Sequence, residues 1–221
     1  MEAYFNGIRR PVTKEMEEVF LGKDHAAVIT IDMHEGHLSE DPDCPCPAPR
    51  AREIIKPIDH FTEECRKKGI PIIHVRSVVR ADGADEKLYP SAWRITFPYV
   101  VGEIPGIADH AKEGTRWNNF SIEVKDTDYI VSTKKRLSAF YPTDLELLLR
   151  NLGIRTIVLT GCMTDCCVLN TAFDGANRDF RVVVPRDLTR GTKELEEPAL
   201  AIISMNLGLV VDSEDLLQYW S

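Results

Sequence analysis

Six short apolar runs alternate with helical patterns along the chain, and this alternation limits the fold more than any other feature. The runs are rich in Val, Ile and Leu and lie at residues 26–33, 71–79, 128–132, 155–161, 180–185 and 207–212. Strands without polar interruption are typical of parallel sheets that helices cover on both faces. We therefore expect an α/β fold with an open, six-stranded, mostly parallel sheet.

Helical patterns fill the segments between these runs. In residues 142–152, Thr143 and Glu146 fit a capping box, and Gly153 follows an apolar stripe of Leu145, Leu148, Leu149 and Leu152. Further helices are expected at residues 54–68, 165–178, 193–206 and 213–219. Residues 1–24 are expected as an N-terminal arm with a short helix. Residues 80–125 lack a regular pattern, which in so long a stretch is typical of a functional lid or interface loop.

The composition argues against several classes of protein. With 35 acidic and 27 basic residues, the net charge is −8, which disfavours a nucleic-acid binder. No apolar stretch reaches the ~18 residues of a membrane helix, and the N-terminus lacks a signal-peptide pattern. We therefore expect a cytoplasmic protein that does not associate with membranes. Six cysteines are too few for a disulfide scaffold, which leaves free thiols.

Three reactive side chains follow expected strands. Asp32 closes the first run, Lys134 follows the run that ends at 132, and Cys167 lies at the start of a helix. Because ligands of open parallel sheets bind beyond the carboxyl ends of the strands, these side chains can share one site. A helix N-terminus and an ammonium lower a thiol's pKa, and a carboxylate can accept its proton. Backbone N–H groups around Met163 could hold an oxyanion.

Each of these residues is weak evidence by itself. A cysteine after a buried strand is more often a small core residue than a nucleophile, and an aspartate that ends a strand is often a turn former. A lone lysine is most often a solvated surface charge. The prediction of a nucleophilic site depends on all three occurring together.

Three motifs resemble the isochorismatase-like cysteine hydrolase superfamily, of the amidohydrolase type. They are IDM at residues 31–33, KKRLSAF at 134–140 and TGCMTDCCVLNTAFDG at 160–175, and the resemblance extends over about residues 25–215. It implies a three-layer α/β/α fold, a hydrolase domain at residues 25–221 and a homodimer or homotetramer.

The resemblance also implies particular site residues. The catalytic triad of the family falls on Asp32, Lys134 and Cys167. A cis peptide is implied between Cys162 and Met163, which would aim the Met163 amide at the oxyanion, so Cys162 and Met163 are expected at the oxyanion-binding position. His34 stands where the family commonly has Gln, so we expect it to make a changed polar contact with the substrate.

Neither a cofactor nor a metal is expected. Nicotinamidases of the family carry Asp-x-His after the second strand, where this chain has His74-Val-Arg-Ser. A nearby loop holds further donors, but their spacing matches no structural zinc pattern and the prolines among them suggest a stiff loop. These donors are His34, His37, Asp41, Asp43, Cys44 and Cys46.

The leading functional hypothesis is a hydrolase that cleaves a C–N bond in a small amide, ureido or carbamoyl compound through a thioester on Cys167. Isochorismatase activity, which is hydrolysis of a vinyl ether, and nicotinamidase activity are alternatives. A catalytically silent binding protein is the alternative outside the enzymes. The sequence does not name the substrate.

Overall fold

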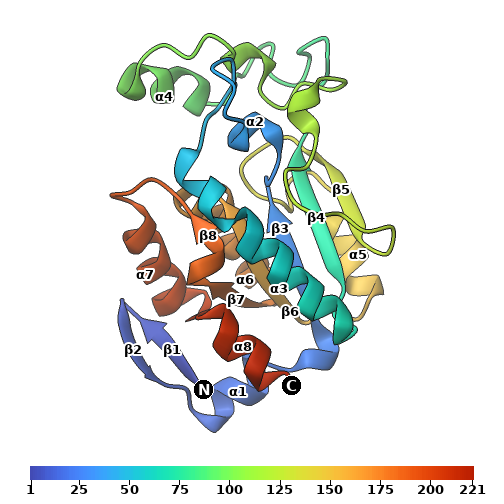
Figure 1. Cartoon of the computed structure of the whole chain (residues 1–221), viewed down its shortest axis with the longest axis vertical. Coiled ribbons are helices and arrows are strands. Elements are labelled where there is room, and N and C mark those ends of the chain that lie inside the picture. The colour runs from blue at the N-terminus through green and yellow to red at the C-terminus, as the bar shows by residue number, and fades with distance from the viewer.

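A computed structural model describes all residues, 1–221, and shows one mixed sheet between helices (Figure 1). The strand order is β2-β1-β9-β7-β6-β3-β4-β5, and the short β8 pairs with β6. The strands are β1 (Glu2–Phe5), β2 (Ile8–Pro11), β3 (Ala26–Ile31), β4 (Ile72–Ser77), β5 (Tyr129–Lys134), β6 (Thr156–Cys162), β7 (Arg181–Pro185), β8 (Thr189–Arg190) and β9 (Gly208–Val211).

The expected parallel sheet is confirmed at its centre. The six apolar runs form β3, β4, β5, β6, β7 and β9, and neighbouring strands of this set pair in parallel. The sheet is larger than expected because β1 and β2 form an antiparallel hairpin, which joins β9 through the pair Tyr4 and Val210. Every residue of β2 is exposed, so this strand carries no apolar alternation by which the sequence could reveal it.

The helices are α1 (Lys14–Phe20), α2 (Glu35–Leu38), α3 (Ile55–Lys67), α4 (Trp93–Val101), α5 (Leu145–Asn151), α6 (Leu169–Asn177), α7 (Glu196–Asn206) and α8 (Ser213–Tyr219). The expected capping box does not form, because α5 begins at Leu145 and Glu146 pairs with Arg178 instead. The expected helix at 165–178 opens with a π-helical turn, Thr164–Val168, before α6. Residues 1–24 contain the hairpin and α1.

Two hydrophobic cores hold the layers together. On one face of the sheet, Phe61 of α3 and Leu216 of α8 belong to the same buried cluster as Val158 of β6. On the other face, Leu149 of α5 and Ile203 of α7 belong to the cluster that contains Leu159 of β6. Successive strand residues therefore serve opposite layers, as the pleat requires. Figure 1 shows α3 and α8 in front of the sheet and α5 and α6 behind it.

Most of the irregular segment at residues 80–125 lies beyond the carboxyl ends of the central strands, and its end runs back beside α3, where Glu123 bonds to Asp59 and Arg66. It holds α4 and two short 3₁₀ turns, Ile107–Asp109 and Arg116–Asn118. With α2 it forms the end of the molecule that Figure 1 shows at the top. This segment therefore covers the edge of the sheet at which parallel strands bind ligands. None of the helices combines the length and the apolar character needed to cross a membrane.

Gly161 permits a close approach between the two central strands. It pairs with Ile31 in the parallel register and has a φ of 105°. A Cβ atom built there would lie 2.2 Å from the carbonyl oxygen of Ile31. Only glycine fits this position, which directly precedes the segment that carries Cys167.

We predict that Gly161→Ala lowers the free energy of unfolding more than Gly153→Ala does. Gly153 also has a positive φ, of 70°, but an added Cβ there meets nothing within 4 Å. Both variants bear the cost of about 1–2 kcal/mol for a left-handed residue, and only the first adds overpacking of about 1–3 kcal/mol. Denaturant unfolding measures the difference. Equal losses in the two variants would contradict the close approach.

Candidate active site

A pocket opens beyond the carboxyl ends of β3, β5 and β6. Asp32, Lys134 and Cys167 all line it, so the structure brings together the three residues that the sequence separates by 102 and 33 positions. Trp93 and Phe97 of α4 also line the pocket. The long segment that follows β4 therefore contributes directly to the pocket.

Asp32 is held rigidly at the end of β3. Its backbone has a φ of 53°, a left-handed conformation that aspartate tolerates better than most residues. The side chain is fully buried. Ser77 donates two hydrogen bonds to Oδ1, from its backbone N–H at 2.9 Å and from its hydroxyl at 3.0 Å. The other oxygen, Oδ2, accepts a hydrogen bond from Nζ of Lys134 at 2.6 Å.

Lys134 occupies the centre of the group. It ends β5 and is only 1% exposed. Its ammonium nitrogen contacts Oδ2 of Asp32 at 2.6 Å, Oγ of Ser77 at 2.8 Å and Sγ of Cys167 at 3.4 Å. An ammonium has three N–H donors, and these three partners account for all of them. Lys134 therefore links the carboxylate to the thiol.

Cys167 lies in the π-helical turn Thr164–Val168 and is 8% exposed at the pocket wall. The backbone carbonyl of Cys167 accepts a hydrogen bond from the hydroxyl of Thr171 at 2.7 Å, which ties the turn to α6. Met163 precedes the turn and also lines the pocket. The Met163 N–H donates no hydrogen bond within the chain, so it is free to bind a ligand atom.

The ion pair sets the protonation states of the site. Burial, the largest single influence, would raise the pKa of Asp32, but the charge and hydrogen bond of Lys134 together with the nearby His34 and His37 outweigh it, and the net shift is downward. Burial would likewise lower the pKa of Lys134, yet Asp32 and the sulfur of Cys167 raise it above its ordinary value. The carboxylate and the ammonium are therefore both charged at neutral pH.

The thiol behaves differently from the expectation that its neighbours lower its pKa. The side chain of Cys166 and burial raise the pKa of Cys167, and together they exceed the lowering effect of Lys134. The same hydrogen bond lowers the pKa of Cys166, so the two neighbouring thiols titrate as a pair. Formation of the thiolate requires that its proton be transferred within the site.

Ser77 is a member of this group that the sequence analysis missed. It lies at the end of β4 and pairs in register with Lys134 of β5. Its hydroxyl joins the carboxylate to the ammonium, as the two distances above show. The sequence offered one sign of this role, which is that Ser77 lies at the end of the strand next to β3. A single serine at such a position matches no distinctive motif.

Two of the expected binding residues do not line the pocket. His34 is fully buried beside Asp32, with Nε2 lying 3.8 Å from Oδ1, and the pocket wall carries His37 and His110 instead. The side chain of Cys162 packs into the hydrophobic core, and its thiol donates to the backbone carbonyl of Asp32 at 3.4 Å. The peptide between Cys162 and Met163 is cis, as the family resemblance implied.

Donors of the loop after β3 separate into two sets. Asp41 pairs with Arg116, and Cys44 donates to the backbone carbonyls of Glu35 and Gly36. His34 and His37 instead gather with a third histidine, His110, and all three are buried. Burial lowers the pKa of each imidazole, to about 3 for His34. These rings are therefore neutral, the form that ligates metals.

We predict that Lys134→Met destabilises the protein by about 3–5 kcal/mol, because Asp32 then stays buried without its partner. Adding Asp32→Asn removes the unpaired charge and should restore part of the loss. Denaturant unfolding of the single and double variants measures both effects. A single variant as stable as the wild type would show that the ammonium does not hold the carboxylate.

The ion pair should also affect how the free energy of unfolding changes at acid pH. The folded pKa of Asp32 lies below its ordinary value of 3.8, so the unfolded chain binds its proton first as pH falls. The stabilisation is complete above that value and is lost as pH drops below it. In urea titrations below about pH 4, the double variant Asp32→Asn/Lys134→Met should lose less stability than the wild type. Parallel pH profiles would contradict a lowered pKa for Asp32.

Comparison with known proteins agrees with this geometry. The family model for the isochorismatase domain matches residues 26–215. An isochorismatase-like hydrolase from Alkaliphilus metalliredigens has a similar structure, with a TM-score of 0.74 and 29% identity over 89% of this chain and 99% of the other. A cysteine hydrolase from Pseudomonas syringae shares the fold, with a TM-score of 0.79, 20% identity and coverage of 96% and 97%.

Curated relatives match over smaller parts of their lengths. A ureidoacrylate amidohydrolase from Methylorubrum extorquens is 44% identical over 38% of this chain and 34% of its own. An N-carbamoylsarcosine amidase from Arthrobacter sp is 28% identical over 73% of this chain and 58% of its own. The matched region thus spans about a third of the length of the amidohydrolase and somewhat over half of the length of the amidase. The match across residues 26–215 places the chain in the isochorismatase family of hydrolases.

Proposed function

We propose that this protein hydrolyses a C–N bond in a small amide, ureido or carbamoyl compound through a thioester on Cys167. The observation that carries the proposal is the contact of one ammonium, on Lys134, with both the Asp32 carboxylate and the Cys167 sulfur. The named activities of two relatives, a ureidoacrylate amidohydrolase and an N-carbamoylsarcosine amidase, support this substrate class.

The first chemical step transfers the thiol proton. As the sulfur of Cys167 attacks the substrate carbonyl, the proton passes to the carboxylate of Asp32. Lys134 changes from the partner of a carboxylate to the partner of a thiolate, and the net charge of the three groups stays at zero. Because no charge enters or leaves the buried site, the step avoids the large cost of an isolated ion. The ammonium therefore compensates for the high pKa of the thiol.

The tetrahedral intermediate then collapses to a thioester. In the tetrahedral intermediate the former carbonyl oxygen carries the negative charge. The free Met163 N–H at the pocket wall is a hydrogen-bond donor suited to that oxygen. Asp32, now protonated, donates its proton to the leaving nitrogen, and the C–N bond breaks. Water attacks the thioester, gives a proton back to the site and releases the acid and the thiol.

The pocket wall fits a small organic substrate. Trp93, Phe97 and Val79 provide apolar surface in the same pocket as the reacting groups. Apolar walls exclude water, which strengthens electrostatic interactions with the ammonium and the carboxylate. Such a pocket binds the carbon skeleton of a substrate while the polar end reaches Cys167.

We predict that Cys167→Ser lowers activity by at least about 10³-fold, in line with the loss of a nucleophile in other hydrolases. Ammonia release from a panel of small amides, ureas and carbamoyl amino acids would identify a substrate. Mass spectrometry of the reacting wild type should find an acyl adduct on the peptide that contains Cys167. Cys65→Ala removes a buried thiol of α3 that packs in the hydrophobic core. This variant is the matched control and should stay active.

Several outcomes separate this proposal from its alternatives. Full activity in Cys167→Ser, or turnover without an adduct on Cys167, would contradict a thioester. Release of pyruvate from isochorismate that persists in Cys167→Ser would favour vinyl ether hydrolysis, which needs acid catalysis more than a nucleophile. Turnover of nicotinamide alone within the panel would restrict the activity to that amide.

A further inference from the structure

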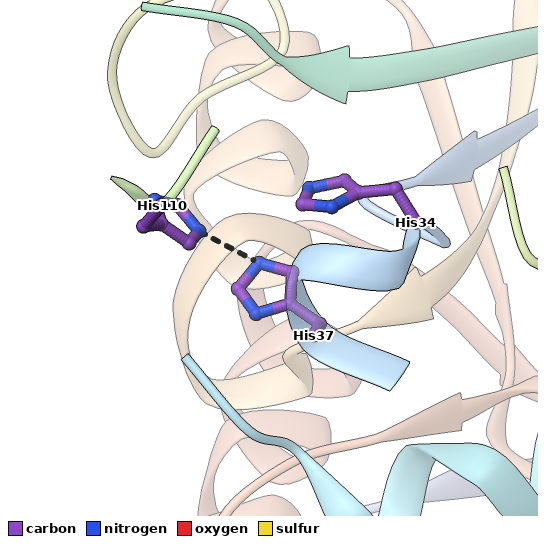
Figure 2. A group of neighbouring side chains, drawn as sticks. All are labelled: His34, His37 and His110. Carbon is purple, nitrogen blue, oxygen red and sulfur yellow. Dashed lines mark hydrogen bonds between the residues drawn. The ribbon is translucent and has the colours of Figure 1, made fainter. Parts of the chain in front are cut away.

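Three histidine rings converge beside the catalytic pocket, and the proposed hydrolysis uses none of them. His34 precedes α2, His37 lies within α2, and His110 follows the 3₁₀ turn Ile107–Asp109. Figure 2 shows the three imidazoles turned toward a common space. One candidate nitrogen from each ring lies within 4.8 Å of the other two. Only these three of the chain's histidines form such a group.

The tautomer of His37 is fixed by a backbone contact. Its Nδ1 lies 2.8 Å from the carbonyl oxygen of Cys46, and because a carbonyl can only accept, Nδ1 must carry the proton. The lone pair of His37 therefore resides on Nε2, which faces His110. Metal-binding histidines commonly hold their second nitrogen in this way, since the bond to a carbonyl orients the ring.

The spacing between two of the rings matches a metal site. Nε2 of His37 and Nε2 of His110 lie 3.3 Å apart (Figure 2). Two nitrogens bound at about 2.0–2.1 Å to a tetrahedral Zn²⁺ are separated by about 3.3–3.4 Å. These two nitrogens therefore already have the spacing of two ligands of one ion. In the metal-free site His110 donates its Nε2 proton to His37, so that proton moves to Nδ1 or is released when the ion binds.

His34 supplies a third donor that lacks any partner. The residue is 0% exposed, and neither of its ring nitrogens makes a hydrogen bond. A buried polar group without a partner costs about 1–3 kcal/mol. Glycine at position 36 leaves room for this ring, because a Cβ there would lie 2.9 Å from Nδ1 of His34. Bringing all three nitrogens to the tetrahedral spacing requires a shift of about 1.5 Å at most, which side-chain rotation supplies.

We propose that His34, His37 and His110 form a binding site for one Zn²⁺ ion in the wall of the pocket. Three imidazoles with a free fourth position are a ligand set that zinc accepts, and soft thiolates are not needed. His37 and His110 line the pocket, so an ion can enter from it and its open position faces the same space as Cys167. When bound there, zinc offers a Lewis-acidic position to a polar group of a ligand.

The site was not foreseen because its donors are far apart along the chain. His110 follows His37 by 73 residues, and it belongs to a segment without a regular pattern. The loop donors adjacent to His37 in sequence do not belong to the site, because Asp41 pairs with Arg116 and Cys44 donates to the backbone carbonyl of Gly36. The proposed site shares no ligand with the triad, although His34 Nε2 lies 3.8 Å from Oδ1 of Asp32.

Zinc binding to protein free of affinity tags tests this proposal. The protein is stripped with a chelator, dialysed, and titrated with ZnCl₂ by calorimetry, with elemental analysis after dialysis. We expect one equivalent per chain and a rise in Tm on adding zinc. His37→Ala and His110→Ala should each bind zinc at least about 100-fold more weakly. Loss of a residue that only hydrogen-bonds to a metal ligand lowers metal affinity by about 10–100-fold, and loss of the ligand itself should cost more. Both variants should keep the Tm of the metal-free wild type within a few degrees.

Control variants identify the donors. His60→Ala removes an exposed histidine of α3, and Cys46→Ser removes the thiol of the loop after β3 that lines the pocket; both variants should bind zinc as the wild type does. Cobalt substitution should give a visible spectrum without the charge-transfer band of a thiolate ligand. Cys167→Ser should also retain zinc, so loss of hydrolysis and loss of metal are separable. The proposal is overturned by sub-stoichiometric zinc in the wild type, equal affinity in the histidine variants, or loss of binding in Cys46→Ser.

Discussion

A buried ammonium placed between a carboxylate and a thiol is the interaction on which the site depends. Lys134 lies 2.6 Å from Asp32 and 3.4 Å from Cys167, and almost none of its side chain reaches solvent. Removing such a charge from water is costly unless partners surround it. The two charges balance, and Ser77 satisfies the remaining donor. The same arrangement stabilises the fold and keeps a cation ready for a thiolate.

The parallel sheet explains how residues so distant in sequence meet. β3, β5 and β6 end at one edge, so the residues at their ends point into one space. Gly161 lets β6 approach β3 closely, and the π-helical turn that follows presents Cys167 at the pocket. The segment with α4 also lines the pocket. Rigid strands thus carry the charges, whereas the more irregular segment forms part of the pocket wall.

Sequence patterns predicted the buried parts of the molecule best. Six strands followed from apolar periodicity. The rule that ligands bind at carboxyl ends of strands suggested that Asp32, Lys134 and Cys167 meet, and the resemblance to the family identified them as its triad. The β1–β2 hairpin was missed because its exposed residues have no apolar alternation. Ser77 and His110 were missed because their roles arise from tertiary contacts, with no local motif to mark them. The position of His34 behind the wall likewise depends on packing around Gly36.

The central claim is that Lys134 makes the sulfur of Cys167 reactive. The direct measurement is the rate at which a small neutral alkylating reagent modifies Cys167, followed by peptide mapping, in the wild type and in Lys134→Gln. An opposite charge within 4–6 Å shifts a pKa by about 1–3 units, so we predict that alkylation of Cys167 slows by about 10-fold or more in the folded variant. Alkylation of Cys167 at the same rate in both proteins would contradict the account.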